Sequence, residues 1–148
     1  MDHDTERKYF LERIMDFAQA LEEPVSDLQL ADENRVLFLL DGRMFEVLAW
    51  IDAESDMICI TTRTDEMPLE KFEEAVQFLK NTLDTCWDYC VAVAPVSARY
   101  DLSMALYAGG FNYESFEAVI YNLMGCAEAI EKKYEDRGEE KEKKEEKK

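Results

Sequence analysis

The chain has 148 residues and a formal net charge of −17, and 47% of its residues are hydrophobic. A chain of this length is one ordinary domain that buries about two-thirds of its unfolded surface, so it needs no disulfide or metal to fold. The apolar share excludes a disordered protein. Its apolar runs, such as those at 36–40 and 47–51, are far shorter than the roughly twenty residues of a membrane span, and a signal-peptide core is absent. We therefore expect a cytoplasmic protein without a membrane partner.

The net charge is unevenly distributed along the chain. Residues 131–148 contain eight acidic and eight basic side chains. Removing them from the totals of 34 acids and 17 bases leaves 26 acids and nine bases in residues 1–130, which therefore carry the whole net charge. Nucleic-acid binding depends on Lys and Arg side chains that neutralise phosphates, so a nucleic-acid partner is excluded. A cationic or amphipathic segment of a partner protein would be attracted instead.

The first half of the chain predicts one helix and a set of strands. Apolar residues spaced along one helical face predict a helix over 4–22, with Asp4 as its N-cap and Pro24 as its stop. The Asp41-Gly42 pair between two apolar runs predicts a tight β-hairpin. The expected strands, of which the first is the weakest, lie at 28–30, 36–40, 44–51 and 57–64.

The second half predicts two helices that flank two strands. Pro68 is expected to open a helix, because its fixed φ suits the first helical position. Strands are expected at 89–94, where Pro95 ends the run, and at 102–107, and Asn112 is expected to cap the last helix. The apolar stripe of the first of these helices comprises Leu69, Phe72, Val76, Leu79 and Leu83. The stripe of the last helix comprises Phe116, Ile120, Leu123, Ala127 and Ile130.

The predicted order is α-β-β-β-α-β-β-α, and the loops between strands are short. We therefore expect an α+β protein with a mainly antiparallel sheet and helices packed on it. Residues 1–134 are expected to form the single domain. Residues 135–148 form a Glu/Lys-rich tail, for which we expect a frayed or disordered structure because Gly138 interrupts its helical pattern.

Residues that would support catalysis are scarce. His3 is the one histidine and lies close to the N-terminus, and no nucleophile motif or phosphate-binding glycine loop occurs. The string Asp52-x-Glu54-x-Asp56 lacks the later glycine and glutamate of a calcium loop, so we interpret it as a hairpin turn. The cysteines form no C-x-x-C pair and are interpreted as reduced, buried thiols: Cys59, Cys86, Cys90 and Cys126.

We therefore predict no catalytic residues, no cofactor and no metal site. The protein is expected to be a binding protein and not an enzyme. An enzyme that relies on carboxylates alone is the minor alternative, because 34 acidic residues bring some of them together by chance.

The predicted hairpin is apolar on both faces, which is unusual for an antiparallel sheet with one wet side. A partner or a second subunit is therefore expected to cover one face, and the candidate surface residues are Phe45, Val47, Ala49 and Ile51. The alternative is that one helix of the same chain packs on each face.

A second candidate function is a small-molecule sensor with a pocket between the sheet and the helices. Its possible wall residues are Trp50, Tyr107 and Tyr113. Ordinary core or half-exposed packing is the alternative role of these aromatic side chains.

The pattern over residues 69–134 carries a family resemblance. The amphipathic helix LEKFEEAVQFLKNTL leads to the strands DYCVAVAP and DLSMALYAGG, and the final helix opens at FNYESFEAVIYNLM. Together with the acidic composition, this order resembles the type III secretion chaperone fold and the bacterial sensory-transduction regulators that share it. The resemblance implies a homodimer that keeps segments of a partner protein extended, or a regulator that binds a partner protein. It carries no functional residues with it.

Overall fold

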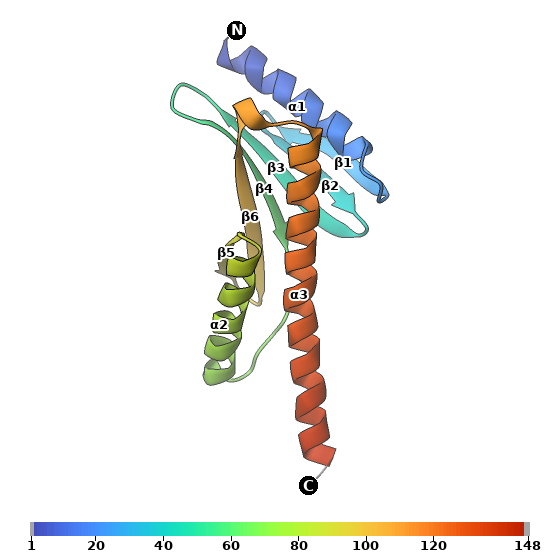
Figure 1. Ribbon diagram of the computed structural model, residues 1–148, viewed down its shortest axis with the longest axis vertical. Coiled ribbons are helices and arrows are strands. Elements are labelled where there is room, and N and C mark those ends of the chain that lie inside the picture. Colours follow the sequence, from blue (N-terminus) through green and yellow to red (C-terminus); the bar gives the residue numbers. More distant parts are fainter. Residues whose placement is uncertain (1, 147–148) are drawn as a thin grey trace.

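The computed structural model describes residues 2–146, and the side chains of residues 2–139 (Figure 1). It confirms an α+β fold with an antiparallel sheet. The elements in chain order are α1 (His3–Gln19), β1 (Val25–Asp32), β2 (Arg35–Leu40), β3 (Arg43–Ile51), β4 (Asp56–Arg63), α2 (Phe72–Asp88), β5 (Ala92–Val96), β6 (Arg99–Tyr107), a 3-10 turn (Ala108–Gly110) and α3 (Tyr113–Glu146).

The sheet has six strands in the order β1-β2-β3-β4-β6-β5, and every neighbouring pair is antiparallel. Four strands therefore lie between α1 and α2, where the sequence predicts three clear strands and a weaker one before them. The β2–β3 turn has Asp41 at φ 51° and Gly42 at φ 81°. Two successive left-handed residues are what a two-residue hairpin turn requires, which confirms the prediction from Asp41-Gly42.

The starts of two helices differ from the prediction. Asp2, and not Asp4, caps α1, because its Oδ1 accepts a hydrogen bond of 2.7 Å from the Thr5 amide. Helix α2 begins at Phe72, four residues after Pro68. Pro68 instead lies in a loop, and the Pro68 carbonyl accepts a hydrogen bond of 2.8 Å from the Tyr134 hydroxyl. This hydrogen bond holds the loop that precedes α2 against α3.

Strand β5 also differs, since it begins at Ala92 and includes Pro95. β5 is an edge strand, where a missing backbone N–H costs no ladder hydrogen bond. Helix α3 starts after Asn112, whose Oδ1 accepts from the Ser115 amide at 2.8 Å, as predicted. It continues past Tyr134 to Glu146. The separation of 135–148 as a tail stays a prediction, and its last two residues lie outside the described range.

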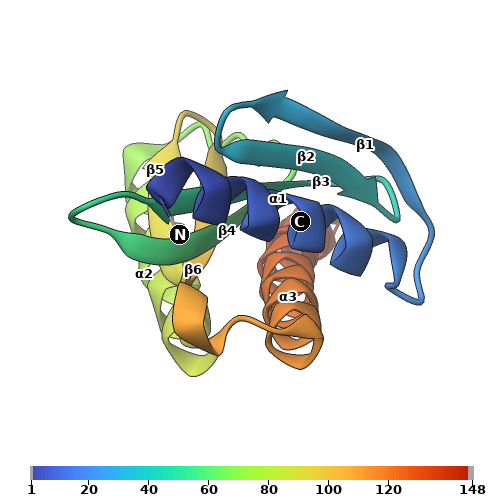
Figure 2. The same ribbon diagram turned by 90° about the horizontal axis from the view of Figure 1, so that it is seen from above.

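The helices pack on one face of the sheet (Figure 2). The ring of Phe116 on α3 lies 6.5 Å from that of Phe38 on β2, and the ring of Phe78 on α2 lies 6.2 Å from that of Tyr100 on β6. Helix α1 crosses β1 to β3 and contributes the fully buried Ile14. The predicted stripe of α3 is entirely buried: Phe116, Ile120, Leu123, Ala127 and Ile130.

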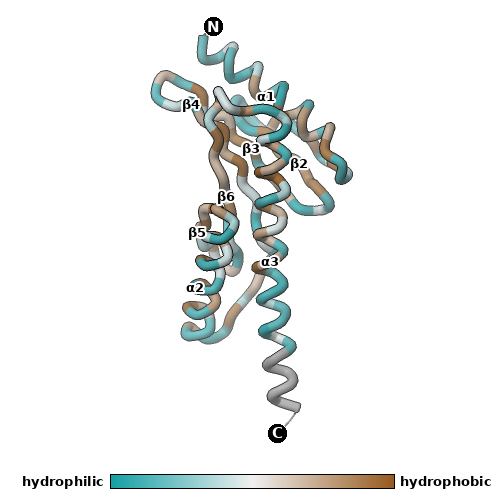
Figure 3. The backbone as a smooth tube through the Cα atoms, viewed as in Figure 1, coloured by the Kyte–Doolittle hydropathy of each residue, from teal (hydrophilic) through white to brown (hydrophobic). Residues whose placement is uncertain are grey.

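The four residues that we expected on a partner surface lie in this core. Phe45, Val47, Ala49 and Ile51 are at most 2% exposed, and they point toward the helices. Alternation along β3 puts every second residue on the helix-covered face. These four residues are therefore core residues and are not available as a partner surface, which corrects the prediction. Figure 3 shows brown stretches along the strands, whereas the coloured part of α3 that extends beyond the sheet is mostly teal.

Among the residues that the structure describes, no helix is both long enough and apolar enough to cross a membrane.

Candidate binding surfaces

The face of the sheet that points away from the helices, which we call the open face, carries a compact apolar area. The registers Leu48↔Cys59↔Ala105 and Trp50↔Met57↔Tyr107 place two rows side by side across β3, β4 and β6. We call these six residues the open patch. Neighbouring strands lie about 4.8 Å apart and successive same-face residues about 7 Å apart, so the patch measures roughly 10 Å by 7 Å between Cα positions.

Two large aromatic side chains dominate the open patch. Trp50 is 56% exposed and Tyr107 is 74% exposed, at opposite ends of the row that Met57 completes. Tryptophan and tyrosine are the residues that most often dominate the binding energy of protein interfaces. The position of this pair on a rigid three-stranded section of sheet suits it to receive another chain.

Charged groups border the open patch on two sides. The β3–β4 turn adjoins the row of Trp50 and carries Asp52, Glu54 and Asp56, all exposed. Its shape is fixed because Asp52 Oδ1 accepts hydrogen bonds from the Glu54 and Ser55 amides, each 2.8 Å long. This confirms that the Asp52-x-Glu54-x-Asp56 string forms a hairpin turn.

On the other side of the open patch the charges are mutually paired. Arg35 Nε lies 3.5 Å from Glu46 Oε1 across β2 and β3, and Arg63 Nε lies 3.0 Å from Asp101 Oδ1 across β4 and β6. The net negative charge near the patch therefore comes from the turn. The surface combines aromatic, aliphatic and acidic character.

The three predicted pocket residues are not brought together. Trp50 and Tyr107 share the open face, but Tyr113 lies at the start of α3, where its ring packs 5.7 Å from that of Phe17 on α1. Trp50 borders a shallow hollow of about 230 Å³ with Arg7 and Asp52, which neither Tyr107 nor Tyr113 lines. Trp50 and Tyr107 are exposed on the sheet, whereas Tyr113 is half-buried against the core, so the three residues do not form one pocket wall.

Helix α2 carries a second apolar surface, which we call the α2 stripe: Phe72, Val76, Leu79, Leu83 and Trp87. These residues recur at intervals of three or four and share one helical face. Phe72 is 82% exposed, Leu83 is 47% exposed and Trp87 is 83% exposed. The sequence predicts an apolar stripe with the same four residues from Phe72 to Leu83 and with Leu69 as the fifth. Trp87 was not part of that prediction. The helix instead buries Phe78, Thr82, Thr85 and Cys86.

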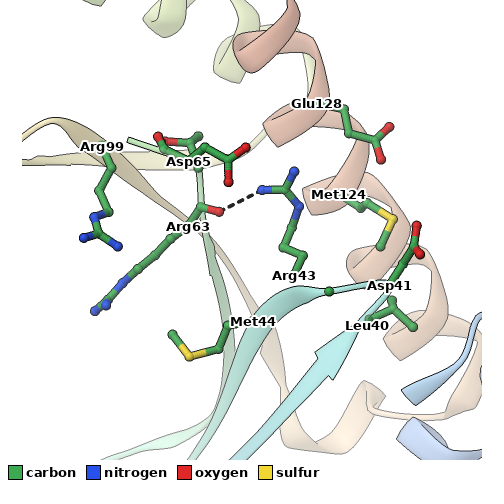
Figure 4. A pocket seen from close by; sticks show the side chains of 11 residues that line it. Leu40, Asp41, Arg43, Met44, Arg63, Asp65, Arg99, Met124 and Glu128 are labelled. Carbon is green, nitrogen blue, oxygen red and sulfur yellow. Dashed lines mark hydrogen bonds between the residues drawn. The ribbon is translucent and has the colours of Figure 1, made fainter. Parts of the chain in front are cut away.

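A hollow of about 370 Å³ lies between the β2–β3 turn and α3 (Figure 4). Three arginines line it, but each has a carboxylate within 3.1 Å: Arg43 with Glu131, Arg63 with Asp101 and Arg99 with Glu66. Arg43 also donates to the Arg63 carbonyl at 2.8 Å. With their charges already matched, these side chains join elements together and are not positioned to capture an anion.

The cysteines occupy different environments. Cys86 and Cys126 are buried, whereas Cys59 is half-buried on the open patch and Cys90 is exposed, which corrects the prediction of four buried thiols. Within the described residues, no group of three or more His, Cys, Asp or Glu side chains is arranged to hold a metal ion.

Comparison with known proteins identifies the fold. No protein-family model matches the chain, and no curated protein sequence is significantly similar to it. A crystal structure of an uncharacterised protein from Methanothermobacter thermautotrophicus superimposes with a TM-score of 0.69 at 14% identity, covering 85% of this chain and 96% of the other. A chain from the crystal structure of the ExsC–ExsE complex superimposes with a TM-score of 0.62 at 17% identity, covering 86% and 92%.

The chain has a type III secretion chaperone-like fold. The similarity to the chain from the ExsC–ExsE complex confirms the predicted fold class. At such low identities the likeness concerns the fold alone. The sensory-transduction part of the predicted resemblance stays a prediction.

Four residues of the open patch were not among the predicted site residues. The available signal was that open-patch residues alternate with residues of the helix-covered face, which are fully buried beside Leu48 and Cys59 and half-buried beside Ala105. It was masked because the residues on the open face are apolar as well. The pairing of β4 with β6 lies between strands that α2 and β5 separate in the sequence, so no local pattern shows it.

Proposed function

We propose that this protein is a non-enzymatic, chaperone-like module that holds a segment of a partner protein on the open patch and acts as a homodimer. The observation that carries the proposal is the exposed Trp50–Met57–Tyr107 row on a face that the helices leave open. Exposed apolar areas of this kind mark interaction sites in folded proteins. The ExsC–ExsE neighbour supports the proposal, since its fold occurs in a protein–protein complex.

The surroundings of the open patch favour a partner segment that is both apolar and basic. Asp52, Glu54 and Asp56 would attract Lys or Arg side chains that flank apolar anchors on the bound segment. The aromatic faces of Trp50 and Tyr107 add a site for a cation over a ring. An acidic or nucleic-acid ligand would be repelled by the same groups.

The α2 stripe supports the homodimer. Phe72 and Trp87 lie at equal distances in sequence from the centre of the stripe, and so do Val76 and Leu83. Two α2 helices packed antiparallel about a twofold axis would therefore place Phe72 of one copy against Trp87 of the other. The same arrangement brings the exposed Lys71 close to the exposed Asp88 of the second copy. The order of apolar residues in the stripe, and the charges of Lys71 and Asp88 at its two ends, therefore match such a twofold arrangement.

A pair of labelled peptides tests the binding proposal. One alternates leucine with lysine and the other alternates leucine with glutamate, and binding is followed by fluorescence anisotropy at low salt. The Leu/Lys peptide should bind at least about tenfold more tightly, and the difference should shrink as salt screens the charges. The double variant Trp50→Ala/Tyr107→Ala should lose about tenfold or more in affinity for it.

The matched control is Tyr9→Ala, which removes an exposed aromatic side chain on α1 and should leave the affinity unchanged. Equal binding of both peptides would refute the charge preference. Binding that survives in the Trp50→Ala/Tyr107→Ala variant would refute the open patch as the site.

A further inference from the structure

Two buried thiols face each other across the contact between α2 and α3. Cys86 Sγ and Cys126 Sγ lie 3.8 Å apart, and the residues are 1% and 0% exposed. They are 40 positions apart in the sequence. A disulfide has its sulfur atoms about 2.05 Å apart, so the two atoms need to approach by about 1.8 Å. That approach requires side-chain rotation together with a small displacement of the helices.

The surroundings of the pair permit local opening. The buried side of α2 next to Cys86 contains the polar Thr82 and Thr85 in place of large apolar side chains. Lys133 on α3 donates a hydrogen bond of 2.5 Å to Thr85 Oγ1, one position before Cys86. Segments with few buried apolar contacts open more often than the rest of a protein, which gives a reagent access to the thiols.

The pKa values of the two thiols are shifted in opposite directions. The hydrogen bond from Cys126 lowers the pKa of the Cys86 thiol, and the same bond is the main cause that raises the pKa of Cys126. In this geometry Cys126 is the hydrogen-bond donor and Cys86 the acceptor, so Cys86 is the more acidic thiol of the pair. A thiolate beside a thiol is the arrangement from which thiol–disulfide exchange proceeds.

We propose that Cys86 and Cys126 form a redox-modification site at which a small disulfide, such as glutathione disulfide, installs an intramolecular disulfide between α2 and α3. The Cys86 thiolate attacks one sulfur of the oxidant, forms a mixed disulfide and releases one glutathione thiolate, which takes up the proton from Cys86. The Cys126 thiolate then attacks the Cys86 sulfur and releases the second glutathione thiolate, which takes up the proton from Cys126. The protein loses two electrons and two protons, and the oxidant is reduced to two thiols.

The disulfide would fasten α2 at its C-terminal half. Trp87, the last residue of the α2 stripe, follows Cys86 directly, so oxidation restricts the movement of that end of the stripe. The chemistry at the two sulfurs does not depend on the proposed binding function. If no disulfide forms, the proposals for the open patch and for the dimer still stand.

The test exposes the reduced full-length protein to glutathione disulfide in native buffer, and then alkylates the remaining thiols and maps the peptides. We expect a cross-linked peptide pair that joins Cys86 to Cys126 in the parent and in the Cys90→Ser control. In Cys126→Ser, glutathione should stay attached to Cys86. Amide hydrogen exchange in α2 should slow by about tenfold on oxidation of the parent, because the cross-link suppresses local opening.

The proposal is overturned if Cys86 and Cys126 of the folded parent both remain free to alkylate after Cys90 has reacted completely. It is also overturned if the Cys86–Cys126 link forms only in urea-unfolded protein. Both results come from the parent chain, so they hold even where a serine variant fails to fold.

Discussion

Arg43 and Glu131 form a two-point ion pair that joins the sheet to the longest helix. Arg43 Nη2 lies 2.5 Å from Glu131 Oε1, and Nη1 lies 3.0 Å from Oε2. The side chains are 16% and 14% exposed. Glu131 Oε2 also accepts from the Asp65 amide at 2.8 Å, so one carboxylate connects β3, the loop before α2, and α3. This junction fastens α3 and the loop before α2 to β3.

Removal of Arg43 should therefore destabilise the protein. Arg43→Ala leaves the largely buried Glu131 carboxylate with only the Asp65 amide, and we expect a loss of about 2–3 kcal/mol in the free energy of unfolding. Urea denaturation measures it. The matched control is Arg99→Ala, whose partner Glu66 is 70% exposed, and it should cost less than about 1 kcal/mol. Equal losses in the two variants would contradict the structural role of the Arg43–Glu131 pair.

The two faces of β3 should respond differently to truncation. Phe45 is fully buried and its ring lies parallel to that of Phe38 at 5.6 Å, so Phe45→Ala should cost about 3–5 kcal/mol. Trp50 is mostly exposed, and Trp50→Ala should change stability by about 0.5 kcal/mol or less. Thermal or urea unfolding of both variants compares them. A large loss from Trp50→Ala would mean that the open patch is covered in the protein.

Tyr113 should titrate at unusually high pH. Its hydroxyl oxygen lies 2.8 Å from Glu117 Oε2 and 3.0 Å from the Ala20 carbonyl oxygen. The hydrogen bond to Glu117 is the main cause that raises the pKa of Tyr113 from 10.0 to about 12. The folded protein therefore keeps a proton that the unfolded chain releases, so this contribution to stability is present below pH 10 and is lost as the pH rises through about 12.

Ultraviolet absorbance of tyrosinate measures this titration. Glu117→Gln should move the Tyr113 pKa toward 10, because the carboxylate charge is removed, whereas Glu114→Gln on the same helix should not. An unchanged titration curve in Glu117→Gln would show that the hydrogen bond does not control the pKa.

The α2 stripe should control oligomeric state. Leu83→Asp and Trp87→Asp place a charge on a surface that is apolar and exposed in the single chain, so each should yield a monomer with unchanged helix content. Light scattering coupled to size exclusion gives the mass. Trp50→Asp on the open patch is the control and should leave a dimer. A monomeric parent protein would contradict the dimer proposal, and a dimer that survives both stripe variants would place the interface elsewhere.

The sequence was sufficient to predict those elements whose local pattern and tertiary environment agree. The stripe of α3 is buried because one long helix runs over the sheet with a single apolar side. The Asp41-Gly42 hairpin follows from backbone conformation alone. In both cases a short stretch of chain contains all the information that decides the structure.

The remaining features depend on long-range packing. Helix α2 buries Phe78 and Thr82 and turns Phe72 outward, because the loop that α3 anchors through Tyr134 and Glu131 sets its orientation. The prediction that both faces of the hairpin are apolar was right about composition and wrong about which face is free. Trp50 and Tyr107 were identified individually, but only the β4–β6 pairing places them in one row.

Site-specific photocross-linking in the native host tests the central claim most directly. A photoreactive phenylalanine analogue replaces Trp50 or Tyr107 on the open patch, and Tyr9 on α1 serves as the control position. We predict that both open-patch positions cross-link to the same stretch of one partner polypeptide, that this stretch combines apolar with basic residues, and that Tyr9 does not cross-link to it. Cross-links from Trp50 and Tyr107 only to a second copy of this chain, or to no protein, would contradict the account.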